Sequence, residues 1–159
     1  MDIETKTKLR TGFTTGSCAT ASSKACVLSI INQKKIEQTD IILPKRSKLD
    51  IQINSCEFTE NSATCSVIKD GGDDPDVTHG AEIFVYVELT NNIGKIEIDG
   101  GEGVGRVTKP GLGLEIGSAA INPTPKKMIL ENVTEISKEI LEKKQIELDN
   151  ILFVPYIYK

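Results

Sequence analysis

The sequence predicts one α+β domain, residues 1–159, with a mixed, largely antiparallel sheet packed with helices at about residues 17–31 and 124–144. In several short segments between turn residues, apolar residues alternate with polar ones, as in half-buried strands. Two longer segments carry apolar residues at helical spacing. The length suits a single domain with a genuine core. Polar, glycine-rich loops between these elements are expected to form a cleft.

The first helix is predicted from a run of small residues after Gly16, in which Ala21, Ala25 and Leu28 follow a helical spacing. Thr15 or Ser17 is expected to cap its N-terminus. Hydroxyls, glycines and open backbone amides at a helix start favour negative charge, so an anion site is an alternative to a simple cap. The small residues would also let another backbone or a ligand approach closely.

The strands come next in chain order. Alternation and turn residues predict strands at residues 41–43, 49–53, 62–68, 83–89 and 95–98. The second helix opens at Asn122 or Thr124 with a proline in its first turn, and Ile129, Val133 and Ile136 mark its apolar face. The apolar run 151–154 after it is consistent with a buried parallel strand.

Residues 69–80 form the most unusual segment, because they combine four aspartates and three glycines with the only histidine of the chain. They lie between two predicted strands, so the polar side chains are displayed at a loop. Carboxylates this close together repel one another unless water, backbone donors, a cation or a ligand satisfies them. A solvated acidic turn is the simpler alternative, since Gly-Gly and Asp-Pro are ordinary turn sequences.

A second polar loop, residues 99–113, is rich in glycine, which lets a backbone approach a ligand closely. Its glycine spacing fits neither the Rossmann fingerprint nor a P-loop. Arg106 and Lys109 lie among the glycines and could hold carboxylates or phosphates.

Composition excludes several classes of function. The net charge of −4 and the absence of tryptophan argue against a nucleic-acid-binding protein. No apolar run is long enough to span a bilayer and the N-terminus lacks a signal-peptide core, so we expect a cytoplasmic protein with no membrane partner. Cysteines 18, 26, 56 and 65 show no CxxC spacing and are expected to be reduced and structural. A nucleophilic Cys18 at the helix start is the alternative.

Four segments together resemble the CbiD family: residues 12–19, 69–80, 100–112 and 120–125. They occur in the family's order, and the resemblance covers residues 9–155. Gly71 is one departure, because alanine is expected there more often. The larger departure is length, since family members continue after the strand near residue 151 into a substantial second half. The resemblance therefore suggests a truncated form or a fragment.

The resemblance implies methyl transfer from S-adenosylmethionine to ring carbon C1 of cobalt-precorrin-5B in anaerobic cobalamin biosynthesis. Cobalt would enter only as part of the tetrapyrrole substrate, with no metal site of the protein's own. Positioning should dominate catalysis. His79 and Asp70 are the expected catalytic residues, and the alternative role of His79 is a hydrogen bond that stabilises its loop. The expected substrate- or cofactor-binding residues are Thr14, Thr15, Gly16, Ser17, Asp73, Asp74, Asp76, Gly101, Glu102, Gly103, Gly105, Arg106 and Lys109.

In this reading, the partner of the domain would be the missing C-terminal half or a second copy in a homo-oligomer. Two other functions stay open at this point. The chain could bind a tetrapyrrole without catalysis, or it could bind a divalent cation at residues 70–76, although the spacing there is not that of an EF-hand loop.

Overall fold

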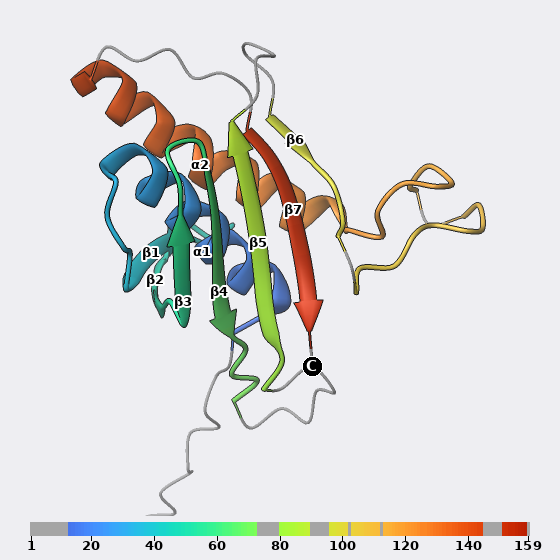
Figure 1. Cartoon of the computed structure of the whole chain (residues 1–159). Helices are drawn as coiled ribbons and strands as arrows, with labels where there is room; N and C mark the ends of the chain where they lie inside the picture. Colours follow the sequence, from blue (N-terminus) through green and yellow to red (C-terminus); the bar gives the residue numbers. More distant parts are fainter. Residues whose placement is uncertain are drawn as a thin grey trace, which may run out of the picture.

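Two helices and a two-stranded hairpin lie on one face of a five-stranded sheet in the described part of the chain (Figure 1). The computed structural model describes residues 13–72, 80–89, 96–101, 103–111, 113–144 and 151–158, and for 137–144 and 151–158 the backbone alone. The elements are α1 (Thr15–Asn32), β1 (Gln38–Ile42), β2 (Lys48–Gln52), β3 (Ser55–Phe58), β4 (Ser62–Ile68), β5 (Glu82–Leu89), β6 (Ile96–Ile98), α2 (Pro123–Lys144) and β7 (Ile151–Tyr158).

The sheet is mixed and largely antiparallel, as the sequence predicts. Its strand order is β3-β4-β5-β7-β6, and every neighbouring pair is antiparallel except β6 and β7. The acidic segment connects β4 to β5, which confirms the predicted strand–loop–strand arrangement. The last strand is parallel to β6 but antiparallel to β5, so the prediction of a parallel strand holds on one side only.

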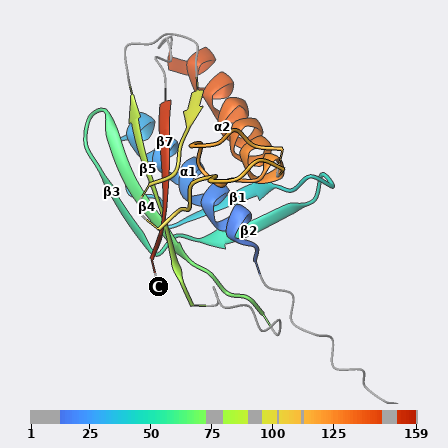
Figure 2. The same cartoon turned by 90° about the vertical axis from the view of Figure 1, so that its right-hand side faces the viewer.

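Helix α1 lies between two layers, with the sheet on one side and α2 with the β1–β2 hairpin on the other (Figure 2). It is therefore buried almost all round, and its small side chains let both layers come close. Two of its buried hydroxyls donate within the helix, Thr20 Oγ1 to Gly16 O and Ser23 Oγ to Ala19 O, both at 2.7 Å, whereas Ser22 Oγ donates to Ile83 O of β5 at 3.3 Å. The expected close approach of another backbone is confirmed.

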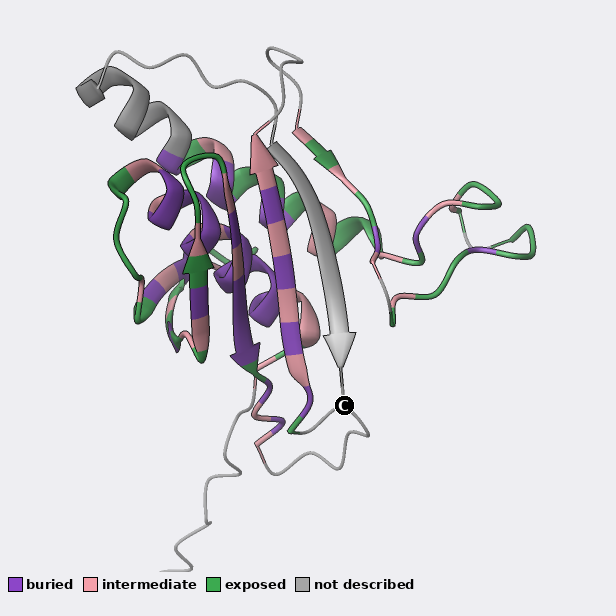
Figure 3. Cartoon of the chain, in the orientation of Figure 1, coloured by how far each residue is buried: buried purple, intermediate pink, exposed green. Residues whose placement is uncertain are grey.

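The core lies between α1 and the inner face of the sheet. Burial alternates along β5, where Ile83, Val85 and Val87 are fully buried and the residues between them are half-buried (Figure 3). Burying such side chains contributes about 1.5–3 kcal/mol each relative to leaving them exposed. The period-2 pattern of the sequence is thus the pattern of contact with α1.

Two expectations about the elements are wrong in detail. Helix α1 begins at Thr15 and Thr14 is its N-cap, so neither Thr15 nor Ser17 has that role. Strand β3 is not among the predicted strands, although Cys56 and Phe58 alternate with polar residues before a turn. It is short and lies at the edge of the sheet, so its pattern is weak. In the part of the chain that the structure describes, no helix is long and apolar enough to cross a membrane.

Candidate functional site

The start of α1 is held by a pair of hydroxyl side chains. Thr14 Oγ1 accepts a hydrogen bond from Ser17 N at 3.0 Å and lies 2.9 Å from Ser17 Oγ. A threonine cap with a partner three residues on satisfies one of the open amides of the first turn. The helix therefore starts at Thr15, directly after its cap Thr14, and this end carries the positive end of the helix dipole.

The two helices meet at their N-termini. A Cβ atom added to Gly16 would lie 3.2 Å from Cγ of Pro125, in the first turn of α2. Any side chain at Gly16 would push against that proline. The glycine predicted at the site thus serves the contact between the helices and keeps their two starts together.

A cavity of about 410 Å³ opens beside this contact. It is lined by three segments: the start of α1, the turn of the β1–β2 hairpin and the first turns of α2. The lining residues are Thr14, Gly16, Ser17, Leu43, Pro44, Lys45, Ser47, Thr124, Pro125 and Met128. No carboxylate is among them. A second cavity of about 260 Å³ shares Leu43, Pro44, Thr124 and Met128 with the first, so the two form one groove between the hairpin turn and α2.

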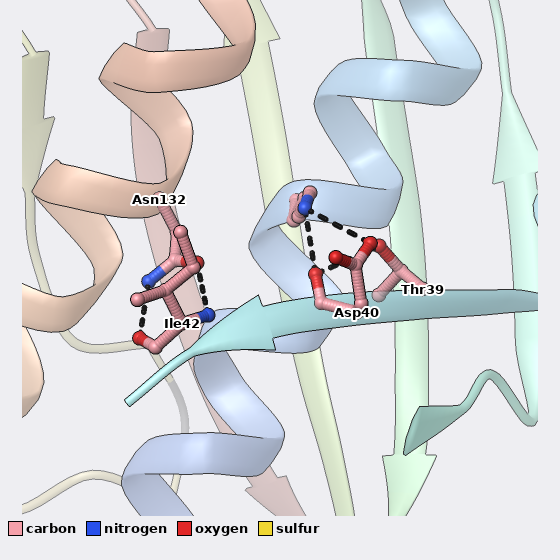
Figure 4. Close-up of polar contacts among 5 residues, drawn as sticks. Thr39, Asp40, Ile42 and Asn132 are labelled. Atoms are coloured by element: carbon pink, nitrogen blue, oxygen red, sulfur yellow. Dashed lines mark hydrogen bonds and ion pairs between the residues drawn. The ribbon is translucent and has the colours of Figure 1, made fainter. Parts of the chain in front are cut away.

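The hairpin that forms one wall of this groove is anchored by Asn132 of α2 (Figure 4). Its side chain, 3% exposed, accepts from Ile42 N at 2.8 Å and donates to Ile42 O at 3.1 Å. The amide thus pairs with the backbone at the edge of β1 as a neighbouring strand would. The sequence analysis missed Asn132, although a polar residue beside Ile129 and Val133 on the apolar face of a helix was a signal.

A second anchor joins the hairpin to α1. Lys24 Nζ donates to Asp40 O at 2.6 Å and lies 3.4 Å from Asp40 Oδ1. Burial raises the pKa of the Asp40 carboxyl, but the charge and hydrogen bond of Lys24 outweigh it, so the pKa lies below its ordinary value. The hairpin is therefore fixed to both helices, and its turn is held over their N-termini.

Positive charge dominates the rim of the groove. Lys45 lines the larger cavity, while Arg46 and Lys127 line the smaller one. Among the described residues that line the groove, Glu131 is the one acidic side chain, and its Oε1 lies 3.8 Å from Lys127 Nζ. The sequence analysis assigned no role to the turn between β1 and β2, so its place as a wall of the groove was also missed.

The acidic loop begins next to the start of α1. Phe13 N donates to Asp70 O at 2.7 Å, which joins the two segments by their backbones. Asp70 Oδ1 accepts from Gly72 N at 2.8 Å, and Gly72 has a φ of 63° that glycine tolerates. The predicted site residues Asp73, Asp74, Asp76 and His79 lie outside the described residues.

The glycine-rich loop is closed by Arg106. Its guanidinium donates to Asp99 Oδ1 at 2.6 Å and to Gly100 O at 2.9 Å. The hydrogen bond from Arg106 is the main reason that the pKa of Asp99 lies below its ordinary value. Gly103 has a φ of 87°, and Gly105 O accepts from Ala120 N at 2.8 Å, which ties the loop to the entrance of α2. Gly101 and the exposed Lys109 lie in the same loop, and Glu102 lies outside the described residues.

The cysteines are free and buried. Burial raises the pKa of Cys18 to about 11, although nearby Lys69 lowers it in part. A thiol with this pKa is protonated at neutral pH, so the alternative of a nucleophilic Cys18 loses its basis. Cys65 also has a raised pKa, because it hydrogen-bonds Cys26 and is buried. The structural interpretation of the thiols agrees with these surroundings. Within the described ranges, no three His, Cys, Asp or Glu side chains are grouped to hold a metal ion.

Comparison with known proteins assigns the fold and these loops to a family. The sequence model of the family described as CbiD matches residues 2–155, which is nearly the whole chain. The chain belongs to the CbiD family. The match includes the cap of α1, the acidic loop, the glycine-rich loop and the entrance of α2, so the resemblance seen in the sequence is confirmed.

Two curated relatives show how similar this CbiD-family chain is to longer proteins. It is 50% identical over 134 residues to the cobalt-precorrin-5B C(1)-methyltransferase of Geobacillus kaustophilus (strain HTA426), covering 84% of the chain and 36% of the relative. It is 45% identical over 148 residues to the protein of the same name from Priestia megaterium, covering 93% and 40%. The chain thus spans little more than a third of the length of these relatives.

A solved CbiD structure supports the fold. The crystal structure of the cobalamin biosynthesis protein (cbiD) from Archaeoglobus fulgidus matches with a TM-score of 0.62 and 28% sequence identity. The match covers 92% of this chain and 44% of that one. The α+β architecture predicted from the sequence is therefore that of the CbiD family.

Proposed function

We propose that this chain forms part of a methyltransferase that methylates ring carbon C1 of cobalt-precorrin-5B in cobalamin biosynthesis, in the cytoplasm. The observation that carries the proposal is family membership together with 45–50% identity to relatives that have this name. S-adenosylmethionine is the proposed methyl donor, and cobalt arrives within the tetrapyrrole. The chain corresponds to 36–40% of those relatives, so we propose that it supplies binding loops and not the complete enzyme.

The contacts between the loops support a shared site. The backbone bond from Phe13 to Asp70 joins the start of α1 to the acidic loop. The approach of Gly16 to Pro125 joins the same start to the first turn of α2, and the bond from Ala120 N to Gly105 O joins the entrance of α2 to the glycine-rich loop. Convergence of all three loops on one cleft remains a proposal, because residues 73–79 and 102 lie outside the described residues.

The groove itself does not fit the methyl donor. The donor carries a sulfonium and an ammonium group against one carboxylate, so its net charge is positive, whereas the described residues that line the larger cavity include Lys45 and no carboxylate. Carboxylates that suit those cations and the ribose hydroxyls are offered by the acidic loop, at Asp73, Asp74 and Asp76. We therefore propose the acidic loop for the donor. His79 is proposed to move a proton of the tetrapyrrole, and Asp70 to hold the loop at its first turn through Gly72.

The experiment replaces the matched region of the Priestia megaterium relative by residues 2–155 of this chain, and this protein is called the chimera below. The purified chimera is incubated with cobalt-precorrin-5B and S-adenosylmethionine labelled in its methyl group. Label should appear at C1 of the macrocycle, at a rate within about tenfold of the relative's own, since 45% of the matched residues are identical.

A chimera that folds and binds the tetrapyrrole but transfers no label would overturn the methyltransferase proposal. That outcome would favour a tetrapyrrole-binding domain without catalysis. The control is a chimera with Asp73→Asn and Asp74→Asn, which should retain its fold and lose most of its transfer.

A further inference from the structure

The groove between the β1–β2 turn and the N-terminal turns of α2 has no assigned ligand. Its larger cavity, about 410 Å³, lies within the size range of small-molecule sites. Both walls are fixed: Asn132 holds β1 to α2, and Lys24 holds β1 to α1. The cavity is therefore a feature of the folded domain and not a gap beside a loose hairpin.

The chemistry of the lining is selective. Leu43, Pro44 and Met128 make the floor largely apolar, while Lys45 stands at the rim of the larger cavity. In the adjoining cavity Arg46 and Lys127 add positive charge, and the carboxylate of Glu131 is placed against Lys127. A ligand that complements this surface has an apolar body and negatively charged arms.

We infer that this groove binds one carboxylate-bearing edge of the tetrapyrrole substrate and excludes the methyl donor. The inference rests on the proposed function, which supplies the two ligands between which the groove must discriminate. A tetrapyrrole of this pathway has an apolar ring system with carboxylate arms around its rim, which matches an apolar floor with a cationic rim. The donor has a sulfonium and an ammonium group against a single carboxylate, so its net charge is positive and a rim of cationic side chains disfavours it.

The inference is testable because added negative charge should change the affinities for the tetrapyrrole and for the donor in different directions. A negative charge added at the rim should weaken binding of the tetrapyrrole and leave binding of the donor unchanged or stronger. Lys45→Glu reverses the charge on the hairpin side. Thr124→Glu adds a carboxylate in the first turn of α2, where the helix dipole favours it, so this variant should fold at least as well as the parent. Arg46 is left unaltered because its backbone has a φ of 67°, which residues other than glycine rarely adopt. A substitution there would change the stability of the turn as well as the charge.

Lys34 supplies matched controls. It is exposed and follows the opposite end of α1, an 18-residue helix, and a helix of that length extends about 27 Å. Lys34→Glu makes the same change in net charge as Lys45→Glu, and Lys34→Gln the same as Thr124→Glu. Any effect of overall charge alone would therefore appear equally in the controls.

The experiment titrates uroporphyrin I, an octacarboxylic tetrapyrrole, into the chimera and follows porphyrin fluorescence. S-adenosylmethionine binding is measured in parallel by calorimetry. We expect the uroporphyrin affinity to fall at least about fivefold in both groove variants, because Lys45→Glu removes an ion pair with a carboxylate arm and Thr124→Glu adds a repelling charge. The Lys34 variants should change it less than about twofold, and donor affinity should not fall in any variant.

Three outcomes would overturn the inference. Equal uroporphyrin affinity in all variants, or no binding by the unaltered chimera, would show that the groove does not hold the tetrapyrrole. Loss of donor affinity in the groove variants would assign the groove to the donor. The methyl-transfer assay tests the proposed function separately from the binding measurements. If the groove variants of the chimera transfer methyl groups with an unchanged KM for the tetrapyrrole, the inference about the groove is wrong and the proposed function stands.

Discussion

At the scale of single residues, polar side chains fix the parts of the candidate site. Asn132 replaces a missing strand neighbour for β1, and Arg106 closes the glycine-rich loop onto Asp99 and Gly100. Arg106 was expected to hold a ligand anion, and that remains a prediction. Its contacts show a structural role as well, because its side chain joins the middle of the glycine-rich loop to the start of that loop at Asp99 and Gly100.

The Asp99–Arg106 pair predicts a titration. NMR should find the pKa of Asp99 below its ordinary value of 3.8, and Arg106→Gln should raise it towards that value. A depressed folded pKa adds stability that is present above the unfolded pKa and is lost as pH falls through the folded one. The gain is small, since both side chains are about half exposed, at 46% and 53%. An Asp99 pKa unchanged by Arg106→Gln would contradict the pairing.

The buried thiols predict chemical inertness. Cys18, Cys26, Cys56 and Cys65 are at most 4% exposed. In native protein at pH 8, iodoacetamide should alkylate all four far more slowly than it alkylates a free cysteine, because a thiol must be exposed and ionised to react. After denaturation, mass spectrometry should find four modified sites. Rapid labelling of Cys18 in the native protein would restore the nucleophile alternative.

Substitutions in the acidic loop are expected to lower activity without lowering stability. Its carboxylates repel one another, so Asp73→Asn or Asp74→Asn should leave the melting temperature unchanged or slightly higher, by the equivalent of at most about 1 kcal/mol. Methyl transfer by the chimera should fall in both variants. A clear drop in melting temperature with full activity would mean that the aspartates only cap a turn.

At the scale of elements, the docking of the β1–β2 hairpin depends on one amide. Asn132→Ala should lower the free energy of unfolding by about 2 kcal/mol, because Ile42 loses partners for both its backbone N–H and its C=O. Chemical denaturation measures the loss. Glu131→Ala changes the exposed neighbouring residue and should cost less than about 0.5 kcal/mol. Equal effects of the two substitutions would contradict the anchoring role.

Secondary-structure elements could be predicted from the sequence where only one face of the element is buried. Ile83, Val85 and Val87 alternate because one face of β5 meets α1, and that period is visible in the sequence. The small residues of α1 indicated close packing, although not that the helix has neighbours on both sides. β3 and the cap at Thr14 were missed, because an edge strand buries little and a cap depends on a single hydrogen bond.

At the scale of the whole molecule, the size of the match predicts weak activity of the isolated chain. Methyl transfer needs two ligands held in alignment, and this chain covers 36–40% of the relatives. The purified 159-residue chain should therefore transfer less than about 1% of the label that the chimera transfers. Comparable rates for the two proteins would show that the described loops suffice.

The candidate site was predictable in its loops but not in its groove. Repeated polar and glycine residues marked the loops at Thr14, Asp70 and Gly101 directly. The groove depends on where the turn at Lys45 lies relative to Thr124, residues that are far apart in the chain. Such contacts follow from tertiary packing, which no local pattern encodes.

The place of β7 between β5 and β6 has a consequence for synthesis on the ribosome. The strand that joins these two neighbours is made last among the described elements, after the long helix α2. Until it emerges from the exit tunnel, the edges of β5 and β6 that will bind it have no partner strand, and such edges are prone to pair with other chains. The nascent domain is therefore most sensitive to aggregation in the interval before β7 emerges, when chaperone binding would protect it most.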